Sequence, residues 1–232
     1  MMTLPISANA LVKDIVNELP KSSDVFKRFR IDFCCGGNIS LNAAAIENNV
    51  EVSTLLDELI VIFENSTPAD KNMDVWLDSD TNTIIDHVIN NIHRPLMVEL
   101  AELSPYVTKV FKVHGESHPE LARVKELFFE YKKEMTEHSA KEETTVFPLI
   151  KKLAENSIEN REETVCYIRE LEKEHDHVGA ILKELREITF DFTPPVDGCG
   201  TYRLVYKRLE LLEGETFMHV HLEQNILFPR YI

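Results

Sequence analysis

The stretch HSAKEETTVFP, residues 138–148, has a second copy in the same chain, HVHLEQNILFP, residues 219–229. Both copies follow the pattern His-x-x-x-Glu-x-x-x-x-Phe-Pro, and matched positions are 81 residues apart. A histidine and a glutamate four positions apart lie on one face of an α-helix, with Cβ atoms about 5–6 Å apart. The repeat therefore predicts two equivalent helices, each of which presents an imidazole and a carboxylate on one side.

The segments around the two copies are typical of long helices. Three stretches rich in turn and capping residues divide the chain beyond about residue 80: KVHGESHPE, AENSIE and TFDFTPPVDG. We predict four helices, over about residues 82–106, 119–153, 157–189 and 196–228. Four long helices with short connections favour an all-α, up-down-up-down bundle. Three prolines are expected to kink or end their helices: Pro95, Pro148 and Pro229.

Polar side chains interrupt the apolar stripe of each predicted helix. The stripes step by three and four residues, and they include Ile89 in the first helix and Thr145 and Leu149 in the second. The His-x-x-x-Glu pairs lie on the second and fourth stripes, and the first and third stripes add one histidine each, 82 residues apart. We therefore expect six polar side chains to meet in the core: His93, His138, Glu142, His175, His219 and Glu223.

A metal centre is the simplest way to accommodate this set. A buried carboxylate without compensation costs several kcal/mol or takes up a proton. Four imidazoles with two carboxylates suit iron, manganese or zinc, and six ligands exceed the four of a tetrahedral zinc site. We predict two metal ions, each with two histidines, bridged by the two glutamates and a solvent oxygen. A coordination position would remain open for a small ligand.

Two other interpretations of these residues are weaker. In the first, each histidine is a hydrogen-bonded core residue and each glutamate an ion-pair partner, but six such groups at matched positions of a repeat need a common partner. In the second, Glu-x-x-His motifs on two helices bind metal as in ferritin-like proteins. That motif occurs here only as overlapping matches on the third predicted helix, Glu172–His175 and Glu174–His177.

The remaining histidines are not expected to bind metal. His177 and His221 follow predicted ligands by two positions, about 200° around the helix, and should face away as surface residues. His87 lies off the stripe of its helix, and His114 and His118 fall in a predicted loop.

The N-terminal part of the chain is typical of several short helices. They cover about residues 11–19 and 22–29, followed by two more that end before residue 64. Ser22 or Ser23 is predicted to cap the second helix, Ser40 the third and Ser53 the fourth. The polar stretch after it indicates a linker. We predict a small helical domain at 1–65, a linker at 66–79 and the bundle at 80–232.

Composition narrows the class of protein. The chain has 232 residues, of which 44% are hydrophobic, so it can fill a core. Its 25 basic and 40 acidic side chains give a net charge of −15, which argues against binding to nucleic acid or to an anionic membrane. It has no long apolar run, and its four cysteines suit a reducing compartment. We expect a soluble protein that is not exported.

The sequence FCCGG, residues 33–37, places two thiols next to two glycines. A disulfide between Cys34 and Cys35 would be strained, because Cα atoms across a trans peptide are only about 3.8 Å apart. Gly36 and Gly37 allow a tight turn that would leave the thiols accessible. The functional interpretation is a pair of reactive thiols that accept NO, bind iron in transit or change redox state. The structural alternative is a buried pair of small side chains. Cys166 and Cys199 are expected to have no role.

With these motifs in place, the chain resembles a known family. The doubled HxxxExxxxFP motif, preceded by single histidines on the partner helices, resembles the hemerythrin-like di-iron domain. IDFCCGG, residues 31–37, resembles the leader domain of the iron–sulfur cluster repair proteins (repair of iron centres). The likeness covers nearly the whole chain in that family's domain order. It implies a cytoplasmic protein with two iron ions, bridged by carboxylates and by an oxo or hydroxo group, at the six residues above.

The resemblance implies repair of iron–sulfur clusters damaged by oxidative or nitrosative stress, by iron donation, by NO chemistry or by both. NO reduction at the iron centre would make the protein an enzyme. Oxygen-carrying hemerythrins use five histidines, and the four on the stripes favour a repair-type site. The alternative is a hemerythrin-like module that binds or senses oxygen or NO without repair. The expected partners are damaged iron–sulfur proteins, NO or O₂ as small ligands, and a second copy of the chain in a homodimer.

Overall fold

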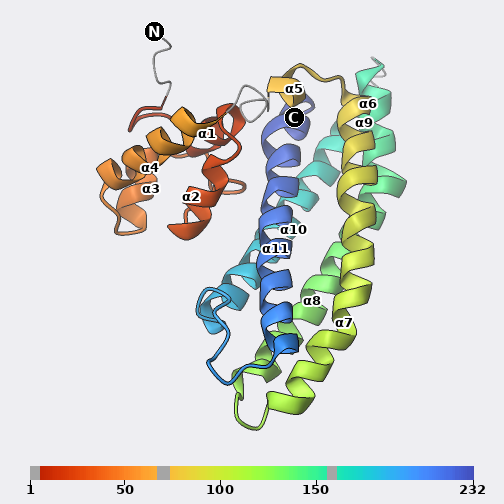
Figure 1. Ribbon diagram of the computed structural model, residues 1–232. Coiled ribbons are helices and arrows are strands. Elements are labelled where there is room, and N and C mark those ends of the chain that lie inside the picture. The colour runs from red at the N-terminus through yellow and green to blue at the C-terminus, as the bar shows by residue number, and fades with distance from the viewer. Residues whose placement is uncertain (1–5, 67–73, 156–160) are drawn as a thin grey trace. The chain divides into compact units, whose positions relative to one another are not determined.

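A computed structural model of the chain describes residues 6–66, 74–155 and 161–232, and all its named elements in these ranges are helical (Figure 1). The prediction of an all-α protein is confirmed. The chain forms two compact units, one of Met1–Asp80 with Val220–Arg230 and one of Thr81–His219 with Tyr231–Ile232. Across the described ranges, no helix has the length and apolar character that crossing a membrane requires.

The N-terminal region contains four short helices: α1 (Val12–Glu18), α2 (Ser22–Arg28), α3 (Leu41–Glu47) and α4 (Val52–Asn65). Their shared core includes fully buried residues from each: Val12, Val16, Phe26, Leu41, Leu55 and Leu59. Helix α5 (Asp74–Asp78) lies inside the predicted linker, whose residues 67–73 fall outside the described ranges.

One of the three predicted helix caps is confirmed. The Ser40 hydroxyl accepts a hydrogen bond from the Ala43 N–H at 3.1 Å. The cap predicted at Ser22 or Ser23 is wrong, because both serines lie buried inside α2, which begins at a tight turn closed by the Leu19 carbonyl. Ser53 is also no cap, because α4 begins at Val52. The backbone carbonyls of Leu19, Pro20 and Lys21 accept the first N–H groups of α2, and that of Glu51 accepts the Thr54 N–H of α4, so these groups bond without a side-chain cap.

Four long helical segments run side by side in the bundle (Figure 1). Their bounds are α6 (Thr81–His87), η1 (Val88–His93) and α7 (Arg94–His114) for the first; α8 (Glu120–Lys141), η2 (Glu142–Val146) and α9 (Phe147–Ala154) for the second; α10 (Arg161–Ile188) for the third; and α11 (Gly200–Leu222), η4 (Glu223–Leu227) and η5 (Phe228–Arg230) for the fourth. Helix α8 contacts both α7 and α10. The part of the chain predicted to start the third helix, near residue 157, lies outside the described ranges.

Two predicted helix ends differ from the structure. The first helix continues to His114 instead of ending near residue 106, because Val107 and Val110 pack into the core and Pro105 is tolerated inside the helix. His114 is therefore helical and only His118 lies in the connection. The fourth helix starts at Gly200 and not at residue 196, because a turn closed by the Gly198 N–H and the Pro195 carbonyl precedes it.

The segments η1, η2 and η4 are π-helical, and each ends two residues before a proline: Pro95, Pro148 and Pro229. A proline has no N–H for the carbonyl four residues earlier, and its ring clashes with that carbonyl. The wider π-turn, with its i→i+5 hydrogen bonds, accommodates this clash. The three prolines thus favour a wider, π-helical turn just before each of them.

The π-turns shift the buried face of the helix by one residue. Ile89, Thr145 and Leu149, which a constant α-helical period places in the core, are only half-buried. Their neighbours Val88, Val146 and Ile150 are fully buried instead. A π-turn adds one residue to the helix, so the buried positions beyond it no longer follow a constant period of 3.6 residues. The predicted core positions Ile89, Thr145 and Leu149 are therefore wrong by one residue.

A left-handed turn follows α10. Phe190, Asp191 and Phe192 have φ angles of 50°, 57° and 54°. Such a conformation costs a residue with a Cβ about 1–2 kcal/mol. The turn is held by the Thr189 hydroxyl, which accepts the Phe192 N–H at 3.1 Å, and by Arg186, which donates to the Asp191 carboxylate at 3.1 Å.

We expect Phe190→Gly to stabilise the protein, because Phe190 is 78% exposed and glycine adopts positive φ without strain. The net gain should be about 0.5–1 kcal/mol, after the larger entropy of glycine in the unfolded chain is deducted. Denaturant unfolding would measure it. The matched control is Glu187→Gly, at an exposed position inside α10, which should lose about 1 kcal/mol. Equal losses for both variants would contradict the expectation.

Candidate metal centre

Each of the six predicted site residues is buried, with at most 2% of its surface exposed. His93 is the last residue of η1, and the two glutamates, Glu142 and Glu223, are the first residues of η2 and η4. His138 lies near the end of α8, His175 in the middle of α10 and His219 near the end of α11. Three of the six residues therefore lie in π-helical turns, which frequently occur at functional sites.

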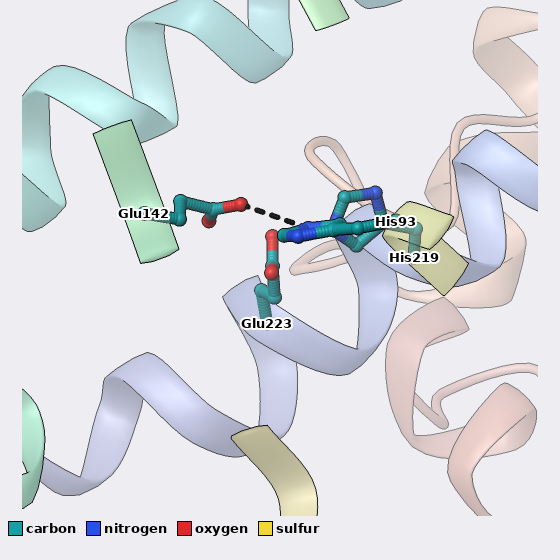
Figure 2. A group of neighbouring side chains, drawn as sticks. All are labelled: His93, Glu142, His219 and Glu223. Atoms are coloured by element: carbon teal, nitrogen blue, oxygen red, sulfur yellow. Dashed lines mark hydrogen bonds and ion pairs between the residues drawn. The ribbon is translucent and has the colours of Figure 1, made fainter. Parts of the chain in front are cut away.

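The six residues form two groups that could each hold a metal ion. One group contains His93, Glu142, His219 and Glu223, and the other contains His138, Glu142, His175 and Glu223. Within each group the ligand atoms lie within 4.8 Å of one another. Figure 2 shows the first group, in which the Glu142 and Glu223 carboxylates point toward the imidazoles of His93 and His219. Both glutamates belong to both groups, so the arrangement is that of a binuclear metal site.

The tautomer of His93 is set by a neighbouring carboxylate. Its Nδ1 lies 2.9 Å from Oε1 of Glu143 and must carry the proton of that hydrogen bond. Nε2 of the neutral ring then has a lone pair, and it lies 3.2 Å from Oε2 of Glu142. It also lies 3.3 Å from Nε2 of His219.

His138 has the same arrangement in the second group. Its Nδ1 lies 2.9 Å from Oε2 of Glu174, which fixes the proton on that side of the ring. Its Nε2 lies 3.3 Å from Oε2 of Glu142 and 3.2 Å from Nε2 of His175. Oε2 of Glu142 is thus close to a ring nitrogen from each group.

These contacts fit a pair of cations better than a hydrogen-bonded core. Nε2 of His93 lies 3.2 Å and Nε2 of His138 lies 3.3 Å from Oε2 of Glu142, so one carboxylate oxygen lies beside a possible ligand nitrogen of each group. The donor set of imidazoles and carboxylates is the one that iron, manganese and zinc accept. The groups present therefore fit a binuclear centre of such metals.

Two positioning residues were missed by sequence reasoning. Glu143 directly follows Glu142 and accepts a hydrogen bond from His93, and Glu174 directly precedes His175 and accepts one from His138. Outer carboxylates orient metal-bound histidines in the same way. The hydrogen bond from His138, together with Lys141, lowers the pKa of Glu174 to about 2. In the sequence, Glu174 belongs only to the weak ferritin-like match Glu174–His177. Such outer carboxylates have no distinctive spacing, so the sequence offered no signal for them.

Two further histidines, His177 and His221, differ in their burial. His177 is about half exposed and lies 3.4 Å from a Glu130 carboxylate oxygen, so it faces away as predicted. His221 is fully buried, which corrects its assignment to the surface. Nε2 of His221 lies 2.8 Å from the Asn17 side-chain oxygen, and burial lowers the pKa of His221 to about 4.

The FCCGG turn is held by one carboxylate. Oδ1 of Asp32 accepts the backbone N–H groups of Cys34 and Cys35, both at 3.0 Å. A Cβ on Gly37 would lie 2.3 Å from the Phe33 carbonyl oxygen, so the turn requires glycine there.

The two thiols of this turn have different surroundings. Cys35 is half-buried, but Cys34 is only 5% exposed, so the prediction of two accessible thiols is wrong for Cys34. A hydrogen bond with Cys35 and burial raise the pKa of Cys34 well above its usual range. Asp32, Cys34 and Cys35 nevertheless form a third group whose ligand atoms lie within 4.8 Å of one another.

We expect Glu174→Gln to weaken metal binding by about 10–100-fold, because His138 would lose the carboxylate that orients its ring. Competition with a chelator, followed by metal analysis, would measure the affinity. The matched control is Glu170→Gln. Lys141 donates a hydrogen bond of 2.9 Å to each of Glu170 and Glu174, but Glu174 also contacts His138. A loss of affinity as large for the control would show that the Lys141 ion pairs, and not the orientation of His138, are responsible.

Comparisons with known proteins agree with this arrangement. Residues 84–231 match the hemerythrin HHE cation-binding domain, and residues 8–61 match ScdA_N, a domain of unknown function. The chain is 40% identical to iron–sulfur cluster repair protein ScdA of Staphylococcus haemolyticus, over 97% of this chain and 99% of that protein. It is 31% identical to iron–sulfur cluster repair protein YtfE of an Enterobacter species, over 94% of both chains. The chain therefore belongs to the ScdA/YtfE family of iron–sulfur cluster repair proteins, which combine an ScdA_N domain with a hemerythrin domain.

Proposed function

We propose that this protein takes part in the repair of iron–sulfur clusters damaged by oxidative or nitrosative stress. In this proposal two iron ions are held by His93, His138, His175 and His219, with Glu142 and Glu223 as bridging carboxylates. The observation that carries the proposal is the pair of buried groups that share both glutamates. The relatives that match over nearly the whole chain are named as iron–sulfur cluster repair proteins, which supports the same function here.

When bound, two ferrous ions would supply iron for transfer to a damaged protein and electrons for the reduction of a small ligand such as NO or O₂. The protein's own residues hold and orient the ligand set. Glu143 and Glu174 fix the protons on Nδ1 of His93 and His138, so that Nε2 of each ring faces the centre. The ring of Phe147 stacks beside the imidazole of His93, with ring centroids 6.0 Å apart, and Leu96 and Val146 are also buried.

We propose a second step at the FCCGG turn, where Cys35 is the more accessible thiol and Cys34 the buried one. Their grouping with Asp32 supports a role in holding iron in transit or in accepting NO. A protein with four free cysteines suits a reducing compartment, so we place the function in the cytoplasm. The clients would be damaged iron–sulfur proteins, and we expect the protein to act as a homodimer.

The metal content of the anaerobically purified protein tests the centre itself. We expect close to two irons per chain. Glu223→Ala should lose more iron than His138→Ala, because Glu223 belongs to both groups and His138 to one. His177→Ala, at an exposed position outside both groups, should keep the full content. A folded wild-type protein with almost no metal would overturn the proposal.

Serine substitutions test the thiols separately from the metal centre. We expect Cys35→Ser and Cys34→Ser to keep the iron content and to slow the reactivation of an iron–sulfur enzyme damaged by NO. The control is Cys166→Ser, which replaces an exposed cysteine on α10, and this variant should reactivate the damaged enzyme at the normal rate. Unchanged repair in both FCCGG variants would remove the thiols from the function.

Two further readouts separate the branches of the proposal. Addition of NO to the reduced protein without air should yield N₂O if NO reduction is part of the function, and its absence would leave iron donation. Stable, reversible oxygen adducts with no effect on damaged clusters would favour a binding or sensing module instead.

A further inference from the structure

A second cluster of reactive groups lies at the other end of the bundle from the metal-binding groups. It is built from the end of α7, the connection between α7 and α8, and the connection between α10 and α11, which lie together at one end of the bundle (Figure 1). Cys199 directly precedes α11, and His114 is the last residue of α7. About 20 helical residues, or roughly 30 Å, separate Cys199 from His219 along α11. The proposed iron centre does not involve this cluster.

Cys199 is an exposed thiol in contact with an imidazole. Its Sγ lies 3.2 Å from Nε2 of His114. Cys199 directly precedes α11, and the helix dipole favours negative charge at this end of the helix. The backbone N–H of Tyr202, and then the imidazole of His114, lower the pKa of the Cys199 thiol to about 7.

The other charged groups of this cluster are paired with one another. His118 lies 3.1 Å from an Asp197 carboxylate oxygen and 3.3 Å from Glu120. The hydrogen bond with Asp197 raises the pKa of His118. Arg203 lies one turn into α11 from Cys199, and its guanidinium donates to the Val196 carbonyl at 3.3 Å. A cation thus contacts the connection that precedes Cys199.

The cluster suits a nucleophilic thiolate better than a metal ion. In the described ranges, the side-chain groups whose ligand atoms converge within 4.8 Å are the two His–Glu groups and the FCCGG group, and Cys199 is in none of them. The sulfur instead has one imidazole and a helix N-terminus, the surroundings that favour the thiolate in reactive cysteines.

We propose that Cys199 is a site of reversible thiolation, at which the sulfur, held by His114 and the start of α11, exchanges with a low-molecular-weight disulfide. The Cys199 thiolate attacks one sulfur of the disulfide, a new S–S bond forms at Cys199, and the old S–S bond breaks. The other half leaves as a thiolate and takes a proton from water. A free thiol reverses the reaction by the same exchange. Arg203 would favour disulfides that carry carboxylates.

The rate of alkylation by iodoacetamide, resolved by mass spectrometry of peptides, tests the state of the thiol. We expect the pH midpoint for Cys199 in the folded protein to lie near 7, and in the urea-unfolded chain near the ordinary value of about 8.5. At pH 7 about half of the folded thiol is then ionised, against about 3% of the unfolded one. The thiolate of a thiol with a lower pKa is a weaker nucleophile, and its rate constant is about fivefold smaller. The folded thiol should therefore react about threefold faster than the unfolded one. Above about pH 8 the order should reverse, because the unfolded thiol is then also largely ionised and is the stronger nucleophile.

Substitutions identify the cause of the shift. His114→Gln should move the midpoint upward toward the unfolded value, whereas His118→Gln, next to Asp197 and not in hydrogen-bond contact with Cys199, should move it less. Oxidised glutathione and cystine, added to the full-length protein at pH 7, should form a first adduct on Cys199 that dithiothreitol removes. Cys199→Ser should abolish this adduct and leave the iron content unchanged, and Cys166→Ser should keep it.

Three results would overturn the proposal. One is a Cys199 midpoint that is the same in the folded and unfolded chain, which the wild-type protein alone can show. Another is equal thiolation of Cys166 and Cys199, which are both exposed. The third is thiolation of Cys199 that persists unchanged at pH 7 in His114→Gln.

Discussion

The crowding of lone pairs in the bundle core is the constraint on which the rest of this structure depends. Nε2 of His93 and of His138 both lie within 3.3 Å of one carboxylate oxygen of Glu142, and each also faces another imidazole. Hydrogen bonds from Nδ1 to Glu143 and Glu174 settle the tautomers of these two rings. With these protons on the outer side, Nε2 of His93 and of His138 faces the Glu142 carboxylate, where lone pairs of all three residues can be shared with cations. Cations are the compensation that the donor set accepts.

The three π-turns show how the backbone meets this requirement. Glu142 and Glu223 each begin a π-turn four residues after a histidine, and His93 ends the third. The proline that follows each π-turn by two residues makes an uninterrupted α-helix unfavourable there. The same prolines that widen the helix therefore fix where its buried face changes. The Phe-Pro of the repeated motif is part of the site's geometry, although neither residue offers a ligand.

Much of this was predictable from the sequence, and the failures have physical causes. His175 is buried as predicted, on a stripe of α10 from Ile168 to Leu185 that keeps one α-helical period. The predictions failed where that period changes, at Ile89, Thr145 and Leu149, because a π-turn leaves no distinct residue pattern apart from the proline after it. The outer glutamates and the buried His221 could not be found from spacing, because their partners are remote in the sequence. The burial of Cys34 was missed for the same reason, since the Asn225 side chain bonds its carbonyl at 2.9 Å from nearly the other end of the chain.

Residues 219–225, at the end of α11 and the start of η4, serve two purposes because successive side chains of a helix point in different directions. His219 and Glu223 lie on one face and belong to the His–Glu groups. His221 and Asn225 lie between and after them and contact Asn17, the Phe33 carbonyl and the Cys34 carbonyl. The backbone that positions two of the six site residues therefore also positions the FCCGG turn, although the bonded residues are 188 and 191 positions apart. A rotation of this helical segment that disturbed one set of contacts would disturb the other. The fold thus gives the thiol turn and the metal ligands one shared element, even though the sequence places them in separate domains.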